Sequence, residues 1–287
     1  MGRPLLLLLI LVLSVLGVLG ALGGWAFVMS GAYDVSATKP HWRPVYELLE
    51  VAMHRSVQQR GDATAVPEAA LRDPQLQEIG ASCFRAHCVA CHGGPGVPPA
   101  SFALGLQPVP RSLTDSARSL SPGELMWVTR HGIKMSGMPA WEYRLSEEQL
   151  LAVTAFVSER LPRLSVPGYR ELTGQAVTAC GPVEPAGSDK AQGVRARGEL
   201  ALRQHGCTAC HAIPGVTGPD SGVGPSLDGF ARRQLIAGRL TNTAVNLERW
   251  IRDPQAIDPN TAMPNLGVSE RSAREMAQYL HQGRGQP

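Results

Sequence analysis

The chain has few aromatic residues and no run of basic ones. Aromatic side chains make up 5% of its 287 residues, and the formal net charge is only +3. So small a positive charge, with no Lys/Arg-rich stretch, argues against a nucleic acid as partner. Few aromatics beside 31 glycines and 23 prolines indicate a loop-rich protein whose small domains have few aromatic side chains from which to build a core.

Only six cysteines are present, and four of them lie in two pentapeptides of one pattern. Residues 88–92 read CVACH and residues 207–211 read CTACH. Cys-x-x-Cys-His is the attachment signature of a c-type haem, in which two thiols bind the porphyrin edge and the adjacent imidazole binds the iron. The sequence therefore predicts two covalently bound haem c groups. The predicted attachment residues are Cys88, Cys91, Cys207 and Cys210, and the predicted proximal ligands are His92 and His211.

Two other kinds of site share the Cys-x-x-Cys pattern. Zinc ribbons place their two pairs within about 15 to 20 residues of each other, whereas Cys91 and Cys207 lie in different halves of the chain. A thioredoxin-like redox dithiol would need β-branched strand runs, which the sequence lacks. Both alternatives are therefore weaker than the haem interpretation.

A haem iron with one imidazole needs a sixth ligand if it only transfers electrons, and a methionine thioether there favours ferrous iron. In the first half of the chain the predicted ligand is Met138, which lies between a glycine and a proline on an irregular loop. Met135 and His131 are the alternatives, since a methionine can also serve core packing. In the second half the predicted ligand is Met263, because Met276 falls within a helical pattern.

The N-terminus carries an uncharged apolar run from Leu5 to Val28. About 20 apolar residues suffice for a transmembrane helix, so the run predicts a membrane anchor. A cleaved signal peptide is the alternative, with a passable cleavage site at residues 21–23. Arg3 precedes the run, which places everything after Ser30 outside the cytoplasm in both cases. The expected location is the cytoplasmic membrane, single-pass, with the haem domains on its periplasmic or outer side.

The motifs divide the chain into five parts. These are residues 1–30 (anchor or signal peptide), 31–70 (juxtamembrane segment), 71–162 (first haem domain), 163–189 (linker) and 190–287 (second haem domain). In the juxtamembrane segment a stripe of apolar residues at helical spacing consists of Val45, Leu48, Leu49, Ala52 and Met53. It predicts an amphipathic helix that lies on the membrane, docks on a partner subunit or packs on the first haem domain.

Each haem domain has a small and a large residue at helical spacing before its first cysteine. The pairs are Gly80 with Phe84, and Gly198 with Leu202. An apolar helical stripe closes each domain, and the first of these begins with the capping box Ser146 to Gln149. This arrangement resembles class I cytochrome c, whose terminal helices cross through a glycine and aromatic contact beside the haem. In the first domain Gly80, Phe84 and Phe156 match that pattern. The resemblance implies a mainly α fold, with two class I cytochrome c domains after an N-terminal transmembrane helix.

Two further resemblances concern respiratory chains. Residues 229–264 resemble the cytochrome c domain fused to subunit II of some bacterial haem-copper oxidases, and the loop 132–141 resembles cytochromes of bacterial respiratory operons. Subunit II also needs two closely spaced cysteines and a histidine for a dinuclear copper centre. Cys83 and Cys180 cannot provide these, so the chain is expected to be a separate cytochrome.

In an exported protein, Cys83 and Cys180 could instead form a disulfide.

Near the second motif, the turn at Gly224 and Pro225 resembles the cytochrome c turn whose proline carbonyl accepts the N–H of the proximal imidazole. The second haem domain also has twelve basic and eight acidic side chains. The candidates there for haem propionate partners are Trp250, Arg232, Arg233 and Arg239. An exposed basic face is the equally acceptable interpretation of the arginines.

These observations predict an electron carrier rather than an enzyme. The expected function is single-electron transfer in a respiratory chain, towards a terminal haem-copper oxidase, with redox proteins and the membrane as partners. One alternative is a cytochrome subunit that accepts electrons from a periplasmic dehydrogenase. A dihaem peroxidase is less favoured, because it would need an iron with an open sixth position.

Overall fold

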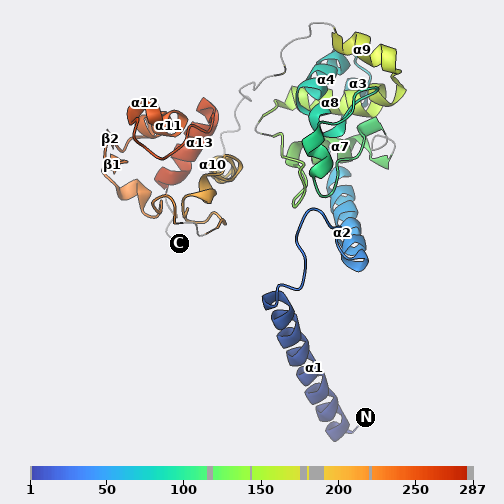
Figure 1. Cartoon of the computed structure of the whole chain (residues 1–287), viewed down its shortest axis with the longest axis vertical. Helices are drawn as coiled ribbons and strands as arrows, with labels where there is room; N and C mark the ends of the chain where they lie inside the picture. The colour runs from blue at the N-terminus through green and yellow to red at the C-terminus, as the bar shows by residue number, and fades with distance from the viewer. Residues whose placement is uncertain are drawn as a thin grey trace. The chain divides into compact units, whose positions relative to one another are not determined.

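The computed structural model describes residues 2–114, 119–142, 144–174, 180, 191–219 and 222–282. Within these residues the chain is mainly helical, as predicted, and two short strands, β1 (Leu235–Ile236) and β2 (Leu240–Thr241), form an antiparallel pair. Contacts divide the chain into two compact units, whose elements are labelled in Figure 1. The units are Met1–Ala140 with Leu150–Ala179, and Trp141–Gln149 with Cys180–Pro287.

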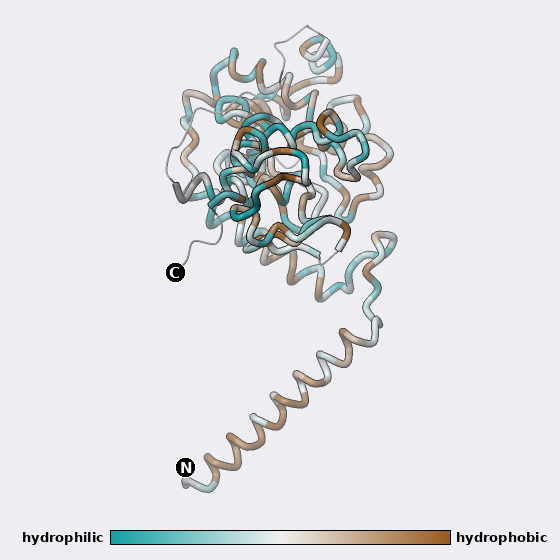
Figure 2. The backbone as a smooth tube through the Cα atoms, turned by 90° about the vertical axis from the view of Figure 1, so that its left-hand side faces the viewer, coloured by the Kyte–Doolittle hydropathy of each residue, from teal (hydrophilic) through white to brown (hydrophobic). Residues whose placement is uncertain are grey.

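The apolar N-terminal run forms one helix, α1 (Arg3–Met29). Pro4 lies in its first turn, where a missing backbone N–H costs no hydrogen bond. Residues Pro4–Met29 are long and apolar enough to cross a membrane and are not buried by the protein. Figure 2 shows the apolar character along the whole helix. A signal sequence near the N-terminus can meet the same criteria of length and composition, so the helix is compatible with both predicted roles.

The juxtamembrane helix α2 (Arg43–Gly61) packs on α7 (Pro122–His131) through two glycines. A Cβ added at Gly61 would lie 2.4 Å from Glu124 Cγ, and one added at Gly123 would lie 2.4 Å from the Gly61 carbonyl oxygen. Val57, one turn earlier, is 3% exposed. Packing on the first haem domain, one of the three predicted roles, is thus observed.

The side of α2 that packs is not the predicted apolar stripe. Leu48, Leu49 and Ala52 are exposed, whereas Val57 and Gly61 are buried and Met53 is half-buried. The physical reason is the close approach of the two glycines, which fixes the helix rotation whatever the apolar pattern suggests. Packing on the first haem domain therefore involves Val57 and Gly61, while most of the predicted stripe at residues 45–53 stays exposed.

The first motif sits among several short helices. They are α3 (Glu68–Leu71), α4 (Pro74–His87), α5 (Val89–His92), η1 (Ser101–Gly105), α8 (Glu147–Ala155), the π-helical η2 (Phe156–Arg160), η3 (Leu161–Arg163) and α9 (Val166–Gly174). Helix α4 crosses α8 at Gly80, where an added Cβ would lie 2.0 Å from the carbonyl oxygen of Ala152. The rings of Phe84 and Phe156 lie 5.4 Å apart and are fully buried. The helix crossing implied by the class I resemblance is therefore present in this unit.

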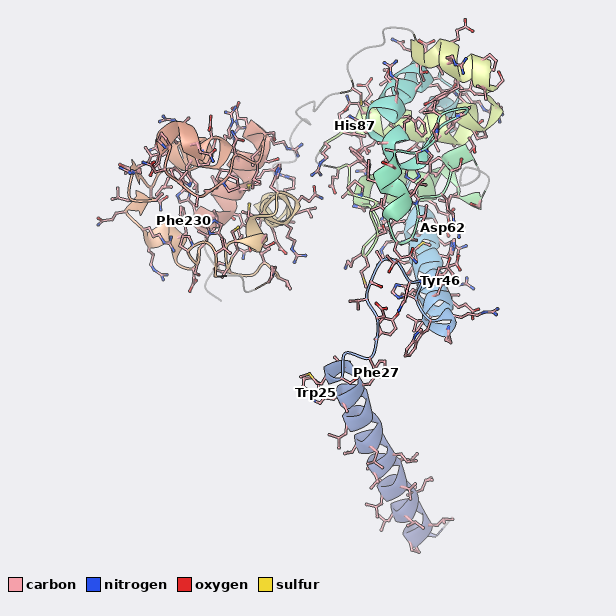
Figure 3. The ribbon with its side chains drawn as sticks, viewed as in Figure 1. Trp25, Phe27, Tyr46, Asp62, His87 and Phe230 are labelled. Atoms are coloured by element: carbon pink, nitrogen blue, oxygen red, sulfur yellow. The ribbon has the colours of Figure 1, made fainter. Side chains whose placement is uncertain are left out.

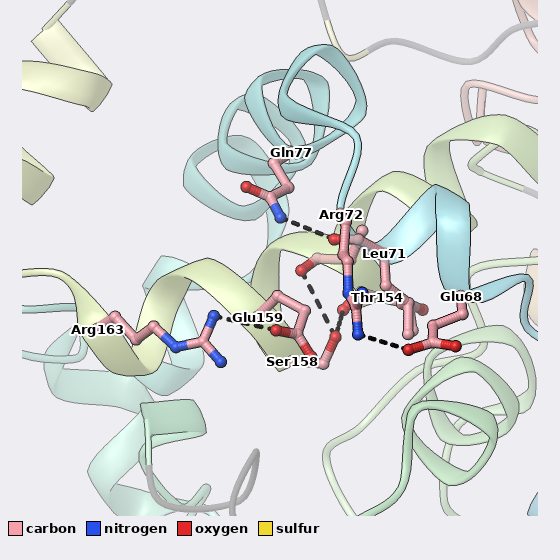
Figure 4. Close-up of polar contacts among 9 residues, drawn as sticks. Glu68, Leu71, Arg72, Gln77, Thr154, Ser158, Glu159 and Arg163 are labelled. Carbon is pink, nitrogen blue, oxygen red and sulfur yellow. Dashed lines mark hydrogen bonds and ion pairs between the residues drawn. The ribbon is translucent and has the colours of Figure 1, made fainter.

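Polar contacts hold the start of α4 and the π-helical turn in place (Figure 4). Gln77 Nε2 donates a hydrogen bond to the Leu71 carbonyl at 2.7 Å, and Ser158 Oγ donates to the Thr154 carbonyl at 2.7 Å. Such side-chain bonds satisfy backbone groups where the helical pattern changes. They support the segment that presents Phe156 to α4.

Residues 166–174, which the sequence analysis placed in the linker, form helix α9 instead. Tyr169 is 2% exposed and Leu172 is 7% exposed. The ring of Tyr169 meets that of Phe84 edge to face at 6.4 Å. Two buried side chains at helical spacing were thus enough to fold a Pro/Gly-containing segment onto the domain. Residues 175–179 and 181–189 of the predicted linker lie outside the described residues.

The second unit repeats the glycine crossing. Its helices are α10 (Ala191–Gln204), η4 (Cys207–Ala209), η5 (Phe230–Arg232), α11 (Ala244–Arg252), α12 (Pro254–Ile257) and α13 (Glu270–Gln282). A Cβ added at Gly198 would lie 2.5 Å from the carbonyl oxygen of Glu275 and 2.7 Å from Tyr279 Cβ, so α10 crosses α13 there. Leu202 and Met276 are buried in the core beside this crossing.

Candidate haem sites

The two pentapeptides adopt the same backbone turn. The carbonyl oxygen of Cys88 accepts hydrogen bonds from the N–H groups of Cys91 and His92, at 3.1 and 2.9 Å. The carbonyl oxygen of Cys207 accepts the matching pair, at 3.2 and 2.9 Å. Each motif thus forms one tight turn that groups its two cysteines and its histidine.

The elements that present the two turns differ. Cys88 follows directly on α4 and begins α5, so the first motif continues a helix. In the second unit Gly206 has φ +70°, a left-handed conformation that ends α10 just before Cys207. A glycine adopts that conformation without steric cost.

Both predicted proximal histidines donate a hydrogen bond from Nδ1 to a backbone carbonyl. His211 Nδ1 lies 2.8 Å from the Pro225 carbonyl oxygen, which confirms the predicted turn. An added Cβ at Gly224 would lie 2.6 Å from His211 Cε1, so only glycine fits beside the imidazole. The bond fixes the ring orientation and leaves Nε2 for a metal.

The corresponding acceptor in the first unit is the Arg111 carbonyl oxygen, 2.7 Å from His92 Nδ1. Sequence reasoning missed this residue. Pro110, Ser112 and Leu113 around it echo the Pro-Ser-Leu at 225–227, with Arg111 inserted. That partial repeat was the available signal, and the inserted residue moved the acceptor from the proline to the arginine.

The two predicted methionine ligands lie in matching turns. The Met138 N–H donates to Ser136 Oγ at 3.1 Å, and the Met263 N–H donates to Thr261 Oγ1 at 3.2 Å. Both methionines are half-buried. Met135, the alternative, is 82% exposed and has φ +60°, an uncommon conformation for a residue with a side chain.

The Met138 loop is closed by its own backbone. The Ile133 N–H donates to the Met138 carbonyl at 3.2 Å, and an added Cβ at Gly132 would lie 2.6 Å from the same oxygen. His131, the remaining alternative, is exposed at the end of α7, with its ring 5.2 Å from that of Trp127. The repeated turn favours Met138 and Met263 as the ligand pair, which stays a prediction.

The first cysteine of each motif has a pKa displaced upwards. Burial raises the pKa of Cys88 to about 12, with a smaller contribution from Cys91. Burial likewise raises the pKa of Cys207 to about 11. A redox-active Cys-x-x-Cys works through a thiol whose pKa is lowered, so these environments disfavour the redox dithiol alternative. Burial also lowers the pKa of His92, which keeps the imidazole in the neutral form that binds metals.

A zinc site finds no support in the described part of the chain. There, no group of three or more His, Cys, Asp or Glu side chains is arranged to hold a metal ion. Cys83 and Cys180 are disulfide-bonded, whereas none of the four motif cysteines takes part in a disulfide. The disulfide left open by the sequence is therefore formed.

The residues around the motifs fit a haem. After the first motif Phe102 is 60% exposed and Leu104 is 61% exposed, and an added Cβ at Gly137 would lie 2.7 Å from Leu106 on the same segment. After the second motif Val223 is 74% exposed. Apolar side chains left uncovered beside a Cys-x-x-Cys-His turn are what a porphyrin ring would bury.

Three of the four residues predicted to contact the propionates are engaged elsewhere. Arg239 Nε pairs with Asp258 Oδ2 at 3.0 Å, and Arg233 donates to the carbonyl oxygens of Ser226 and Asp228. Trp250 is 6% exposed within the core of the second unit. Arg232 is exposed, as the alternative interpretation of a basic face requires.

Comparison with known proteins places a cytochrome c domain in the chain. Residues 75–157 match the family described as cytochrome c oxidase, cbb3-type, subunit III. The chain is 38% identical over 85 residues to cytochrome c oxidase subunit 2 of Alkalihalophilus pseudofirmus, covering 29% of this chain and 24% of that protein. It is 30% identical over 90 residues to the same subunit of Bacillus subtilis, covering 29% of this chain and 25% of that protein.

The chain thus spans about a quarter of the length of these curated relatives. No solved structure matches it. The matches support a c-type cytochrome that carries haem c, is of the electron-carrier type and is related to respiratory oxidases. They cover only part of the chain.

Proposed function

We propose that this chain is a membrane-anchored dihaem cytochrome c that passes single electrons in a respiratory chain, towards a terminal haem-copper oxidase. The observation that carries the proposal is the duplicated set of parts. Each unit has a Cys-x-x-Cys-His turn, a carbonyl acceptor for the histidine Nδ1, a hydroxyl-capped turn before a Met-Pro pair, and a glycine-mediated helix crossing.

A bound haem would supply an iron that changes its charge by one electron without breaking bonds. The protein's own residues then perform the remaining tasks. Cys88 and Cys91 would hold the edge of the first porphyrin. The carbonyl oxygen of Arg111 orients the His92 ring by accepting the hydrogen bond from its Nδ1–H. In the second unit Pro225 orients His211, and residues 261–263 present the methionine sulfur. With His92 and Met138 holding one iron, and His211 and Met263 the other, neither iron would have a free position for a substrate, so we favour an electron carrier over a peroxidase.

The relation to cytochrome c oxidase subunits supports an oxidase as electron acceptor. Electron entry from a dehydrogenase complex is compatible with the same two sites, and it would make the chain an intermediate carrier between the two. We propose α1 as the anchor that keeps the haem domains on the outer side of the cytoplasmic membrane.

The direct test is the haem count. The full chain, solubilised in detergent, should hold two haem groups per polypeptide that survive acid-acetone extraction. The variants Cys91→Ser and Cys210→Ser should each lower the intact mass by one haem. Loss of both haems in either variant, or extraction of the colour from the wild type, would refute the dihaem proposal.

A further inference from the structure

The first half of α2 has an uncovered apolar side. Leu48 is 69% exposed, Val51 is 60% exposed and Leu49 is 43% exposed, and Ala52 is exposed beside them. We call these four residues the outer face of α2. Gln59 lies on the same side three turns after Leu48, so the helix surface becomes polar towards its end.

The charged residues of this half are directed elsewhere. Glu47 Oε1 accepts a hydrogen bond from Arg43 Nε at 2.8 Å. Glu50 Oε1 pairs with Arg111 Nη2 at 3.2 Å, on the side of α2 that packs against the first haem domain. The outer face therefore carries no charge across its first turns, while the opposite side is attached to the domain.

The beginning of α2 lies against the end of α1. Trp42, which immediately precedes α2, has its ring 5.8 Å from that of Phe27 in the last turn of α1. Tyr33 lies between them in sequence, with its ring 5.2 Å from that of Trp42 and its hydroxyl 2.5 Å from His41 Nδ1. Figure 3 labels Phe27 at this end of α1 and Tyr46 in the first turn of α2. Tryptophan and tyrosine with such polar ends are typical of the membrane–water interface.

We propose that the outer face of α2 lies in the headgroup region of the membrane that α1 spans. This inference rests on the proposed anchor. Lipid is favoured over a second protein because the face adjoins the end of the anchor. Four side chains also make a surface far below the roughly 800 Å² per partner of a stable protein interface. Interfacial helices bury their apolar side only about 5–10 Å deep, which four such residues can achieve.

The consequence would be a fixed distance between the first haem and the membrane surface. Because Glu50 ties α2 to Arg111, and Arg111 accepts the His92 hydrogen bond, the membrane contact is one ion pair away from the proximal ligand. A helix held at the surface would keep the first haem domain near the membrane.

Photo-crosslinking in nanodiscs of phosphatidylethanolamine and phosphatidylglycerol tests the proposal with the full chain. Benzoylphenylalanine is introduced at Leu48, at the matched control Gln59 and, to report on the anchor, at Leu16. Haem content verifies folding of each variant, and Val51 is the second position if the Leu48 variant fails to assemble. Mass spectrometry after irradiation then identifies what each position contacts.

We expect lipid adducts at positions 48 and 16, with a yield at 48 several times that at 59. Two results would overturn the interfacial helix and leave the anchor intact, provided that position 16 gives lipid adducts. One is protein adducts instead of lipid adducts at position 48, and the other is equal yields of lipid adducts at positions 48 and 59. Absence of lipid adducts at 16 would contradict the anchor, and the inference with it.

Discussion

The imidazole of His92 donates a hydrogen bond from Nδ1 to the carbonyl oxygen of Arg111, over 2.7 Å. The side chain of Arg111 in turn pairs with Glu50 on α2. The orientation of a predicted haem ligand is therefore coupled to a helix outside the cytochrome c domain proper. The described part of the second unit has no such ion pair at the histidine acceptor, because the side chain of Pro225 carries no charge.

The first prediction concerns this coupling. Glu50→Gln should raise the midpoint potential of one haem. Without the ion pair, Arg111 is held less firmly, and the hydrogen bond that its carbonyl accepts from His92 weakens. That hydrogen bond makes His92 a more basic ligand, and a more basic ligand favours ferric iron. Global stability should fall by no more than about 1 kcal/mol, since the pair is partly exposed, with the Arg111 side chain 71% and the Glu50 side chain 33% accessible. A redox titration measures the shift. Glu47→Gln on the same helix is the control, and an equal shift there would assign the effect to charge alone.

The two helix crossings give the second prediction. Gly80→Ala would place a Cβ 2.0 Å from the Ala152 carbonyl, a backbone atom that cannot move aside cheaply. We expect roughly 1–3 kcal/mol of destabilisation, confined to the first cytochrome domain. Denaturant titrations followed by haem absorbance should then separate into two transitions. Gly174→Ala, which meets nothing within 4 Å, should leave the curve unchanged.

The sequence predicted the histidine acceptors and the packing of α2 only where a local sequence pattern, rather than tertiary packing, determines the structure. Pro225 could be predicted as the His211 acceptor because the residues from Gly224 onward resemble the cytochrome c turn, and the structure has that hydrogen bond. Arg111 was missed because it interrupts the matching Pro-Ser-Leu pattern, and its carbonyl is placed by the path of the loop rather than by its side chain. The sequence predicted an amphipathic α2 but left open which surface it contacts, and it did not identify the side that packs on α7. Gly61 and Gly123 contribute nothing to an apolar stripe, yet their small size decides which side can approach α7.

The third prediction distinguishes the methionines of the first loop. Met138→Ala should remove about half of the far-red charge-transfer band of sulfur-ligated ferric haem and lower one midpoint potential, because the thioether stabilises ferrous iron. Met135→Ala should leave both unchanged, as its side chain is 82% exposed. Met263→Ala should remove the other half of the band. The opposite result for Met135 would mean that the ligand register is shifted by three residues.

The last prediction concerns the basic second domain as a docking surface for an oxidase. Arg232 is exposed, whereas the charge of Arg239 is offset by Asp258 at 3.0 Å, so Arg232 is the better candidate for steering. Arg232→Glu should slow electron delivery to oxidase-containing membranes at low ionic strength, because charges outside the contact act mainly on encounter.

At high salt the mutant and wild-type rates should converge, since screening shortens the reach of the field. The double variant Arg239→Gln/Asp258→Asn removes one charge of each sign, keeps the net charge and should leave the rate near wild type. Stopped-flow oxidation at two salt concentrations measures all three proteins. If Arg232 instead contacts a haem propionate, its reversal would shift the potential of the second haem with little dependence on salt, and a redox titration of the same samples would reveal that shift.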